Sequence, residues 1–395
     1  MGGGVAALEA LLAVRSLDAK LASVSLVAAT PSFAYRPLAV AEPFGLGKSH
    51  RFDLTGIARD QRASLHVAGV DAVDHGRRRL VTWDGRELAY DLLLLAVGAR
   101  AETAVPGSVS ILGPSYTGRF RTVLRALDKR KARRIAFAVP AGASWPLPLY
   151  ELALLTAAHV AERKLHKVQL DLITHESEPL DLFGAKASAA VRGLLDERGV
   201  RLHVNRVPVE ARDGQLWITP GPALAADHVV SLPRLVGPAI HGLPTGADGF
   251  IPVDLHGRVP GLEGVYAAGD ATTCPIKQGG VAAQQADAAA EAIAAATGVD
   301  IDPRPFRPVL RGLLLTGGQP RYLRAEVSGG RGEDWPVSEM ALWWPPSKVA
   351  GHHLAPYLAL HHDELQAPRG GMGVEVALDE GVARHHTAAA AGHHA

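Results

Sequence analysis

The chain has 395 residues, 47% of them hydrophobic and 21% charged, which is the balance of an ordinary globular protein of about two to three domains. It carries 41 Lys and Arg against 40 Asp and Glu, so no general attraction to nucleic acid or to an anionic membrane is expected. The single cysteine excludes an intrachain disulfide, a CxxC pair and a multi-thiolate metal site, and no metal is predicted. No apolar run approaches the roughly 20 residues of a spanning helix. A cytoplasmic location is therefore predicted, with any membrane contact peripheral and on the inner face.

The chain opens with a glycine-rich turn that leads into an apolar helix. Residues 2–7 read G-x-G-x-x-A. Such glycines let the backbone approach a pyrophosphate, which then lies at the helix N-terminus. Gly2, Gly4 and Ala7 are therefore candidate cofactor contacts. The motif normally follows a strand, and only Met1 precedes it, so the first strand of a dinucleotide-binding unit is predicted to be missing, through a misassigned start or a truncation.

A strand is predicted over 23–27, where a dinucleotide-binding unit normally continues into an acidic residue that binds the adenosine ribose. This chain has no acid there, and Thr30 offers only a hydroxyl. Arg36 lies in the loop that follows, and we consider both a phosphate contact and an ordinary surface arginine.

Short alternating strands with an Asp84-Gly85 turn are predicted between residues 65 and 97. They end in a continuous apolar run at 92–97, which is typical of a buried parallel strand. Gly98 follows directly and would allow close approach of the backbone to a ligand.

The same order of elements then recurs. Strands are predicted over 134–139, 168–173, 200–204 and 227–232, helices over 149–163 and 185–198, and a hairpin turn at Asp213-Gly214. A second dinucleotide site should show G-x-G-x-x-G after the strand at 134–139. Only Gly142 remains of that motif, and three nearby prolines lack the N–H groups that a pyrophosphate needs. Glu176 could hold a ribose or serve as a surface or capping residue, so NAD(P)H binding is left open.

A basic run also precedes the strand at 134–139. It comprises Lys129, Arg130 and Lys131, followed by Arg133 and Arg134. A solvated helix end and a partner-binding site are both open interpretations.

The most informative segment is 264–280. It predicts a buried strand, then Gly269 and Asp270 at the strand tip, then a loop and a helix. A carboxylate can accept hydrogen bonds from the ribityl hydroxyls of a flavin. A helix N-terminus favours the electron-rich N1/O2 edge of the reduced flavin ring.

This segment resembles the FAD-dependent pyridine nucleotide–disulfide oxidoreductases, in particular the branch of sulfide:quinone oxidoreductases and type II NADH dehydrogenases. The likeness is carried by residues 264–270 and 276–280. It implies that FAD is the cofactor, that Asp270 binds the ribityl chain and that the helix start points at the flavin. The implied contacts there are Gly269, Asp270, Gln278, Gly279, Gly280 and Val281.

The resemblance further implies an α/β fold with two nested, doubly wound dinucleotide-binding domains. An FAD-binding domain would comprise residues 1–115 and 235–300, and a second dinucleotide-binding-like domain residues 116–234. A C-terminal section would comprise residues 301–395, with a disordered His- and Ala-rich tail after Arg384.

The lone thiol excludes the cysteine relays on which disulfide reductases and sulfide:quinone oxidoreductases depend. Cys274 is either a small packing residue or a flavin-proximal thiol. Lys277 is the candidate catalytic residue, as a charge near the pyrimidine edge of the flavin, and the alternative is a surface lysine. The pair Trp343-Trp344 fits a membrane interface, the protein core or a homodimer contact.

Three functions remain open at this point. The first is a peripheral flavoenzyme that reduces a quinone-like or small-molecule acceptor. The second is a soluble NAD(P)H-dependent flavin oxidoreductase. The third is a flavin-binding or flavin-free protein without turnover.

Overall fold

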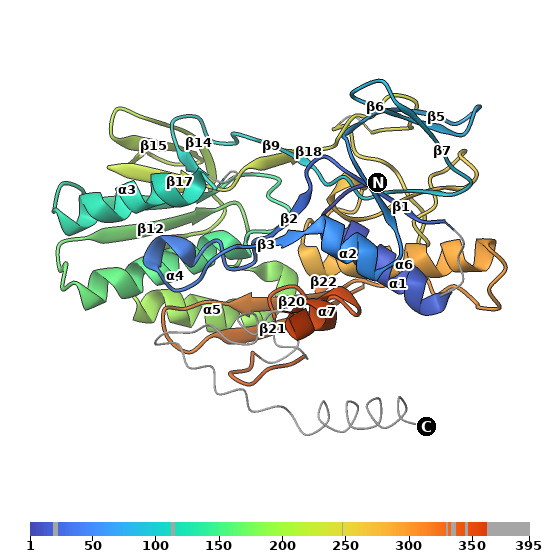
Figure 1. Cartoon of the computed structure of the whole chain (residues 1–395). Coiled ribbons are helices and arrows are strands. Elements are labelled where there is room, and N and C mark those ends of the chain that lie inside the picture. The colour runs from blue at the N-terminus through green and yellow to red at the C-terminus, as the bar shows by residue number, and fades with distance from the viewer. Residues whose placement is uncertain are drawn as a thin grey trace.

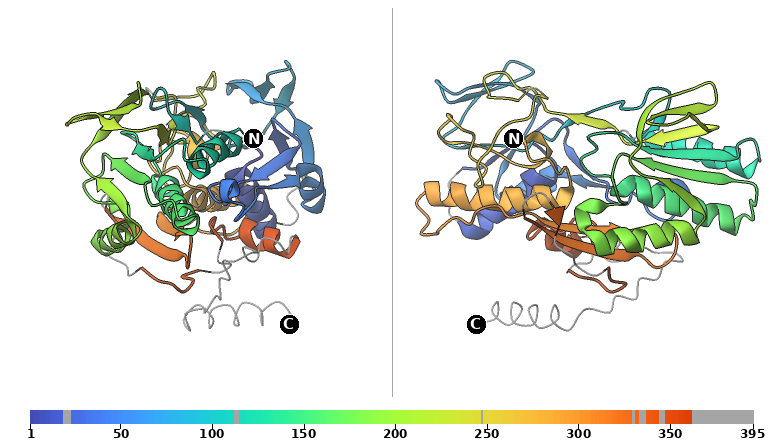
Figure 2. Two further views of the ribbon diagram at one scale, coloured as in Figure 1. Left: turned by 90° about the vertical axis from the view of Figure 1, so that its left-hand side faces the viewer. Right: turned by 180° about the vertical axis from the view of Figure 1, so that it is seen from behind.

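The computed structural model describes residues 1–18, 23–111, 115–246, 248–328, 331–332, 337–343 and 347–361. Two α/β units lie side by side, and a C-terminal section packs along one side of both of them (Figure 1). The two further views of Figure 2 show the same arrangement from the side and from behind.

The first unit is built from two segments of the chain that are far apart in sequence. Its helices are α1 (Val5–Leu17), α2 (Leu54–Asp60) and α6 (Gly279–Ala296). Its strands are β1 (Ser25–Ala28), β2 (Ser32–Tyr35), β3 (His50–Asp53), β4 (Ser64–Val67), β5 (Val70–Asp74), β6 (Arg79–Thr82), β7 (Glu87–Ala89), β8 (Leu93–Leu95) and β19 (Val265–Ala267). Strand β1 pairs in parallel with β4, and β8 pairs in parallel with β19.

The start of the chain lies between these two strand pairs. The Gly2 N–H donates to the Val27 carbonyl at 2.7 Å, and the Met1 carbonyl accepts from the Ala96 N–H at 2.7 Å. Gly2 has φ +126°, and a Cβ at this position would collide with the Ala96 carbonyl. Only glycine therefore fits where the backbone turns from the sheet toward α1.

The second unit contains a five-stranded parallel sheet of order β10-β17-β11-β12-β13. Its strands are β10 (Val109–Ser110), β11 (Arg134–Val139), β12 (Gln169–Thr174), β13 (Val200–His203) and β17 (His228–Ser231), and its helices are α3 (Tyr116–Asp128), α4 (Leu147–Glu162) and α5 (Ala185–Glu197). The largest hydrophobic cluster joins this sheet to the helices and to the C-terminal section. The hairpin strands β14 (Val207–Arg212), β15 (Gln215–Thr219) and β16 (Leu224–Ala225) supply residues to the smaller cluster on the other face. Strands β9 (Arg100–Glu102) and β18 (Arg234–Val236) pair where the chain passes between the units.

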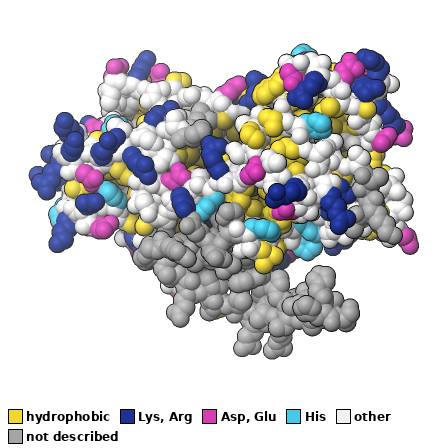
Figure 3. Space-filling view, in the orientation of Figure 1, with side chains coloured by type: hydrophobic (Ala, Val, Ile, Leu, Met, Phe, Trp, Pro, Cys, Tyr) yellow, Lys and Arg dark blue, Asp and Glu magenta, His cyan; other side chains and the backbone are white. Residues whose placement is uncertain are grey.

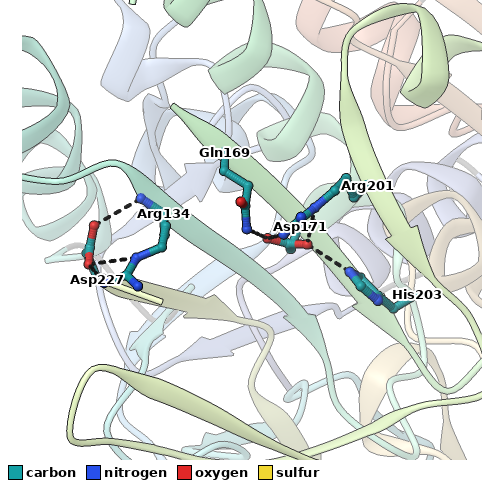
Figure 4. A network of polar contacts seen from close by, with 6 residues as sticks. All are labelled: Arg134, Gln169, Asp171, Arg201, His203 and Asp227. Atoms are coloured by element: carbon teal, nitrogen blue, oxygen red, sulfur yellow. Dashed lines mark hydrogen bonds and ion pairs between the residues drawn. The ribbon is translucent and has the colours of Figure 1, made fainter. Parts of the chain in front are cut away.

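A buried carboxylate ties the edge strand β13 to its neighbour β12 (Figure 4). Asp171 on β12 accepts two hydrogen bonds from Arg201 on β13, at 2.9 and 2.8 Å, and lies 2.7 Å from His203 Nε2. Gln169 donates a further bond at 3.0 Å. These donors outweigh the effect of burial and lower the pKa of Asp171 to about 2.

The C-terminal section comprises β20 (Val309–Leu314), β21 (Arg321–Ser328), β22 (Arg331–Gly332) and α7 (Leu354–His361). Trp343 is 5% exposed, packs edge-on against Tyr322 at 5.2 Å between ring centroids, and donates from Nε1 to the Ser347 carbonyl. The core interpretation is therefore correct for Trp343, and the membrane-interface interpretation is wrong for it. Trp344 and the tail after Arg384 lie outside the described residues.

Most of the predicted elements are present. The strand expected at 134–139 is β11, and both predicted hairpin turns occur, with positive φ at Gly85, Asp213 and Gly214. The strand expected before Gly98 is shorter than its apolar run, because only residues 93–95 pair with β19. Among the described helices, none combines the length and apolarity needed to cross a bilayer.

Candidate functional site

The tip of β19 presents a carboxylate without a partner. Gly269 has φ +78°, and its N–H donates to Gln285 Oε1 on α6 at 2.7 Å, which fixes the turn that follows the strand. Asp270 comes next, and its carboxylate makes no hydrogen bond within the described part of the chain. Burial raises the pKa of Asp270, and Lys277 lowers it in part. A desolvated carboxylate without donors is costly, so this group is suited to accept hydrogen bonds from a ligand.

Two helix N-termini point their free N–H groups toward the same edge of the sheet. Helix α1 begins at Val5, and the described residues provide no partner for the N–H groups of Val5, Ala6 and Ala7, while Gly4 caps the helix without a side chain. The space where a Gly4 Cβ would lie is open to at least 4 Å. This combination of free donors and an open approach fits a pyrophosphate.

The strand tip and the two helices meet at Gly269. A Cβ on Gly269 would lie 3.0 Å from Ala6 Cβ on α1 and 3.4 Å from Ala282 Cβ on α6. The structure thus brings Gly2, Gly4 and Ala7 together with Gly269 and Asp270, although 260 residues separate the two segments.

Some residues at the start of α6 make contacts within the protein, and others have backbone N–H groups without a partner in the described residues. Gln278 caps the helix by accepting from the Val281 N–H at 2.8 Å, and its Nε2 donates to the Arg311 carbonyl at 3.1 Å. Gly279 makes room for Val349, because a Cβ there would lie 2.9 Å from Val349 Cγ2. The N–H groups of Gly279 and Gly280 have no partner in the described residues, so they are the groups of this helix start that can face a ligand.

Lys277 is buried beside this helix start, with 8% of its surface exposed. Its Nζ donates to the Thr272 carbonyl and lies 3.9 Å from the centroid of the Phe250 ring. Burial lowers the pKa of Lys277, and the neighbouring Asp270 raises it in part. The surface-lysine interpretation is therefore wrong, and the site holds a cation next to an unpartnered carboxylate.

The remaining candidates of the first unit lie at the same edge with weaker support. Thr30 is exposed and donates to the Ser32 carbonyl at 2.9 Å, and Arg36 is exposed without a side-chain bond among the described residues. Gly98 follows β8 with φ +74° and open space around its Cβ position. A glycine is favoured at position 98 because the backbone has a positive φ there, and not because a neighbouring atom would collide with a Cβ.

The second candidate nucleotide site lies in the other unit, at the carboxyl ends of β11 and β12. Glu176 is 7% exposed, and its Oε2 accepts from Tyr150 at 2.6 Å and from Thr174 at 2.7 Å. Its Oε1 is buried without a partner in the described residues. Burial raises the pKa of Glu176 to about 7. The interpretation of Glu176 as a surface residue is therefore wrong. Its buried Oε1 remains able to accept a hydrogen bond from a ligand.

The loop before α4 supports a phosphate less well than the loop before α1. Gly142 has φ +73° and open space around it. Pro148 lacks an N–H, and the Leu149 N–H is already bonded to the Pro146 carbonyl. Trp145 packs edge-on against Phe183 at 5.7 Å, so its bulk faces a neighbouring ring.

Cys274 is half-buried against the largest hydrophobic cluster, and its Sγ contacts the Ile276 carbonyl at 3.8 Å. Burial raises the pKa of the Cys274 thiol. A thiol in this state is a poor nucleophile, so the packing interpretation is favoured.

Sequence reasoning missed two buried glutamates that lie at the same position in the two units. Glu9 is the fifth residue of α1 and Glu151 the fifth residue of α4, and both are 0% exposed. Glu9 accepts from the N–H groups of His353 and Leu354 at 2.6 and 2.8 Å. Glu151 accepts from the Leu315 N–H at 2.9 Å and from Lys348 Nζ at 2.6 Å. The signal was a charged residue inside an apolar segment, repeated in the helix that follows each predicted nucleotide loop.

A second missed feature is a carboxyl pair between α1 and α6. Burial, together with the neighbouring Glu9 carboxyl group, raises the pKa of Asp287 to about 8. Two carboxyl groups this close favour a shared proton, and the pair lies between α1 and α6.

Two linked α/β units, with a carboxylate and two helix N-termini at one strand edge, are the architecture of a two-domain dinucleotide-binding fold. The sequence profile described as pyridine nucleotide-disulphide oxidoreductase matches residues 1–292. The chain therefore belongs to this family, whose members are flavin-dependent oxidoreductases.

Comparison with solved structures agrees with this fold. The sulfide:quinone oxidoreductase of the hyperthermophilic bacterium Aquifex aeolicus is similar over 85% of each chain, with a TM-score of 0.77 and 20% identity. A ferredoxin reductase of Rhodopseudomonas palustris is similar over 83% of this chain and 82% of its own, with a TM-score of 0.63 and 18% identity. NDH2 of Plasmodium falciparum in complex with NADH covers 69% of this chain and 63% of its own, with a TM-score of 0.57 and 16% identity. A search of curated proteins gives no match.

Proposed function

We propose that this protein holds FAD at the carboxyl edge of the first unit and passes electrons through it to a quinone-like or small-molecule acceptor without a redox cysteine pair. The observation that carries the proposal is the half-buried, unpartnered carboxylate of Asp270, which directly follows Gly269 where the starts of α1 and α6 meet. FAD, when bound, supplies the electron-transfer chemistry of the site.

Each part of the edge has a distinct role in this proposal. The free N–H groups at the start of α1, with Gly2, Gly4 and Ala7, would hold the pyrophosphate. Asp270 would accept hydrogen bonds from the ribityl hydroxyls. Gly279 and Gly280, with the positive end of α6, would face the ring edge that gains negative charge on reduction.

Lys277 supplies a fixed positive charge to the same edge. Its Nζ is held by the Thr272 carbonyl and the Phe250 ring, so its position is set before any ligand arrives. A preorganised cation of this kind stabilises developing negative charge at little cost in reorganisation.

The second function, a soluble NAD(P)H-dependent oxidoreductase, is favoured by one observation. Glu176 Oε1 is buried and unpartnered in the described residues, at the end of β12, where a ribose is bound in dinucleotide-binding units. The proline-containing loop before α4 weighs against it, because it offers few free N–H groups to a pyrophosphate.

The test begins with the visible spectrum of the purified protein, followed by anaerobic addition of NADH or NADPH. Bound flavin that stays oxidised with nicotinamide, and is reduced by another donor, supports the first function. Rapid bleaching by NADH supports the second function. Absence of bound flavin after reconstitution with FAD would contradict both.

The role of Asp270 is tested by Asp270→Ala, which we expect to lower the flavin content per chain because the ribityl hydroxyls lose their acceptor. The matched control is Asp71→Ala, on β5 of the same unit, where the side chain is exposed. Thermal unfolding of both variants separates loss of cofactor from loss of fold. Equal flavin content in wild type and Asp270→Ala would count against the assignment.

A further inference from the structure

A cavity of about 210 Å³ lies at the end of the second unit that is remote from both nucleotide edges. Its floor is apolar and is formed by Leu127, Ala132, Leu165 and Val168. Its walls are basic and are formed by Arg130, Arg133, Lys164, His166 and Lys167. No acidic residue lines it.

The position of the cavity separates it from the candidate nucleotide sites. It is formed where α3 and α4 end and where β11 and β12 begin. Nucleotides bind at the carboxyl ends of parallel strands, and this cavity lies at their amino ends. In Figure 3, Lys and Arg side chains gather at this end of the molecule, on the left of the view.

The basic side chains of the cavity are not neutralised by the protein. Within the described part of the chain, none of the five makes an ion pair or a side-chain hydrogen bond. Two nearby acids are engaged elsewhere, since Asp128 pairs with His159 and Asp227 pairs with Arg134, while the exposed Glu162 at the end of α4 does not line the cavity. Four permanent charges are therefore concentrated here on a chain whose net charge is only +1.

The dipoles of α3 and α4 do not account for the concentration of basic residues around the cavity. Basic residues often compensate the free carbonyls at a helix C-terminus. Here backbone donors already bind those carbonyls, since Lys131 N–H donates to Ala126 and Leu165 N–H donates to Val160. Arg130 and Lys164 both adopt φ near +50°, at 55° and 53°, so the two helices end in the same way beside the cavity.

We propose that this cavity binds a phosphate-bearing anion. Two arginines offer forked donors and two lysines offer point charges, which together suit a group with several negative oxygens. The apolar floor accommodates the organic part that carries the phosphate. The source is either a soluble phosphorylated molecule or the headgroup of an anionic phospholipid.

The first experiment titrates the purified full-length protein with inorganic diphosphate and measures binding by calorimetry. The double variant Arg130→Gln/Lys164→Gln should bind at least roughly tenfold more weakly, because it loses one charged donor from each wall. The control Lys129→Gln/Lys131→Gln removes the same charge from the same region without touching the lining. It should change binding by no more than about twofold. Flavin content and thermal unfolding monitor the fold of each variant.

A second experiment identifies the source. Flotation with phosphatidylglycerol vesicles, against phosphatidylcholine vesicles, is compared for wild type and both double variants. Vesicle binding that only the cavity variant loses supports the lipid headgroup, and diphosphate binding without vesicle binding supports a soluble ligand. The proposal is overturned if neither probe binds. It is also overturned if the two double variants weaken binding equally, since binding would then reflect the overall positive charge of this region and not the cavity.

Discussion

At the scale of single residues, the proposed flavin site combines two opposite charges, a buried Lys277 and a half-buried Asp270. Asp270 is desolvated and lacks hydrogen bonds in the described residues, and Lys277 is held by the Thr272 carbonyl and the Phe250 ring. Each charge lowers the cost of burying the other. A ligand that donates to Asp270 and gains negative charge near Lys277 would use both.

For Lys277 we expect the substitution Lys277→Gln to make bound flavin harder to reduce. Loss of the fixed cation removes stabilisation of the negative charge that reduction creates. The midpoint potential should fall by roughly 30 mV, which corresponds to about 1.4 kcal/mol for two electrons. A spectroscopic redox titration measures it, with Lys131→Gln as an exposed control. An unchanged potential would mean that Lys277 is a packing residue.

At the same scale, Asp171 makes the second unit sensitive to acid. Its pKa of about 2 lies below the ordinary value of 3.8, so it contributes stability above pH 4 that is lost as the pH falls toward 2. We expect Asp171→Asn to lower the free energy of unfolding by about 2 kcal/mol at pH 7. Urea unfolding from pH 7 to pH 2.5 should show this difference shrinking, whereas a difference that stays constant would point to geometry rather than charge.

At the scale of elements, helices α1 and α6 pack together with a pair of carboxyl groups between them. Asp287 and Glu9 lie between them, and Glu291, Arg304 and His352 supply the nearby charges. Glu9 also accepts from the first N–H groups of α7, so the pair links the helices behind the flavin edge to the C-terminal section.

The pH dependence of this pair has the opposite sign to that of Asp171. The pKa of Asp287 is raised from 3.8 to about 8, so the folded protein holds a proton that the unfolded chain has released. This contribution to stability is present below about pH 4 and declines as the pH rises to 8. We expect Asp287→Asn to match wild type in Tm near pH 5 and to exceed it by a few degrees near pH 9. Thermal unfolding across this range measures the effect, and a variant that is less stable at every pH would contradict it.

Sequence patterns predicted single elements better than contacts between them. The strand at 134–139 and the two hairpin turns followed from local periodicity and turn residues, and the glycine loop before α1 and the Gly269-Asp270 tip were found from motifs. The burial of Lys277 and Glu176 was not predictable, because it depends on Phe250 and Tyr150, which arrive from other parts of the chain. The use of Gln278 as a helix cap likewise depends on the register of α6.

At the scale of the whole molecule, the segment 347–354 joins the parts together. Lys348 reaches Glu151 on α4, Val349 packs against Gly279 at the start of α6, and His353 and Leu354 bind Glu9 on α1. One short stretch therefore contacts α1 and α6 in the first unit and α4 in the second unit.

We expect Lys348→Met to destabilise the fold by about 3–5 kcal/mol, because Glu151 would be left as an uncompensated buried charge. The double variant Glu151→Gln/Lys348→Met should recover part of this loss, since it removes the charge and retains an acceptor for the Leu315 N–H. Chemical unfolding of both variants measures the difference. If the double variant is no more stable than the single one, the ion pair is not the source of the effect.

The glutamate of α1 also places a constraint on the order of events during synthesis. Glu9 and the His353 N–H that it accepts from are 344 residues apart, and Glu151 and Lys348 are 197 apart. Both carboxylates therefore leave the ribosome long before their partners, and α1 and α4 each carry an unpartnered charge on an apolar face until then. Contacts this distant in sequence close slowly. Final packing of both units thus depends on the synthesis of residues 348–354, and nascent chains that stall before residue 348 should remain prone to capture by chaperones and proteases.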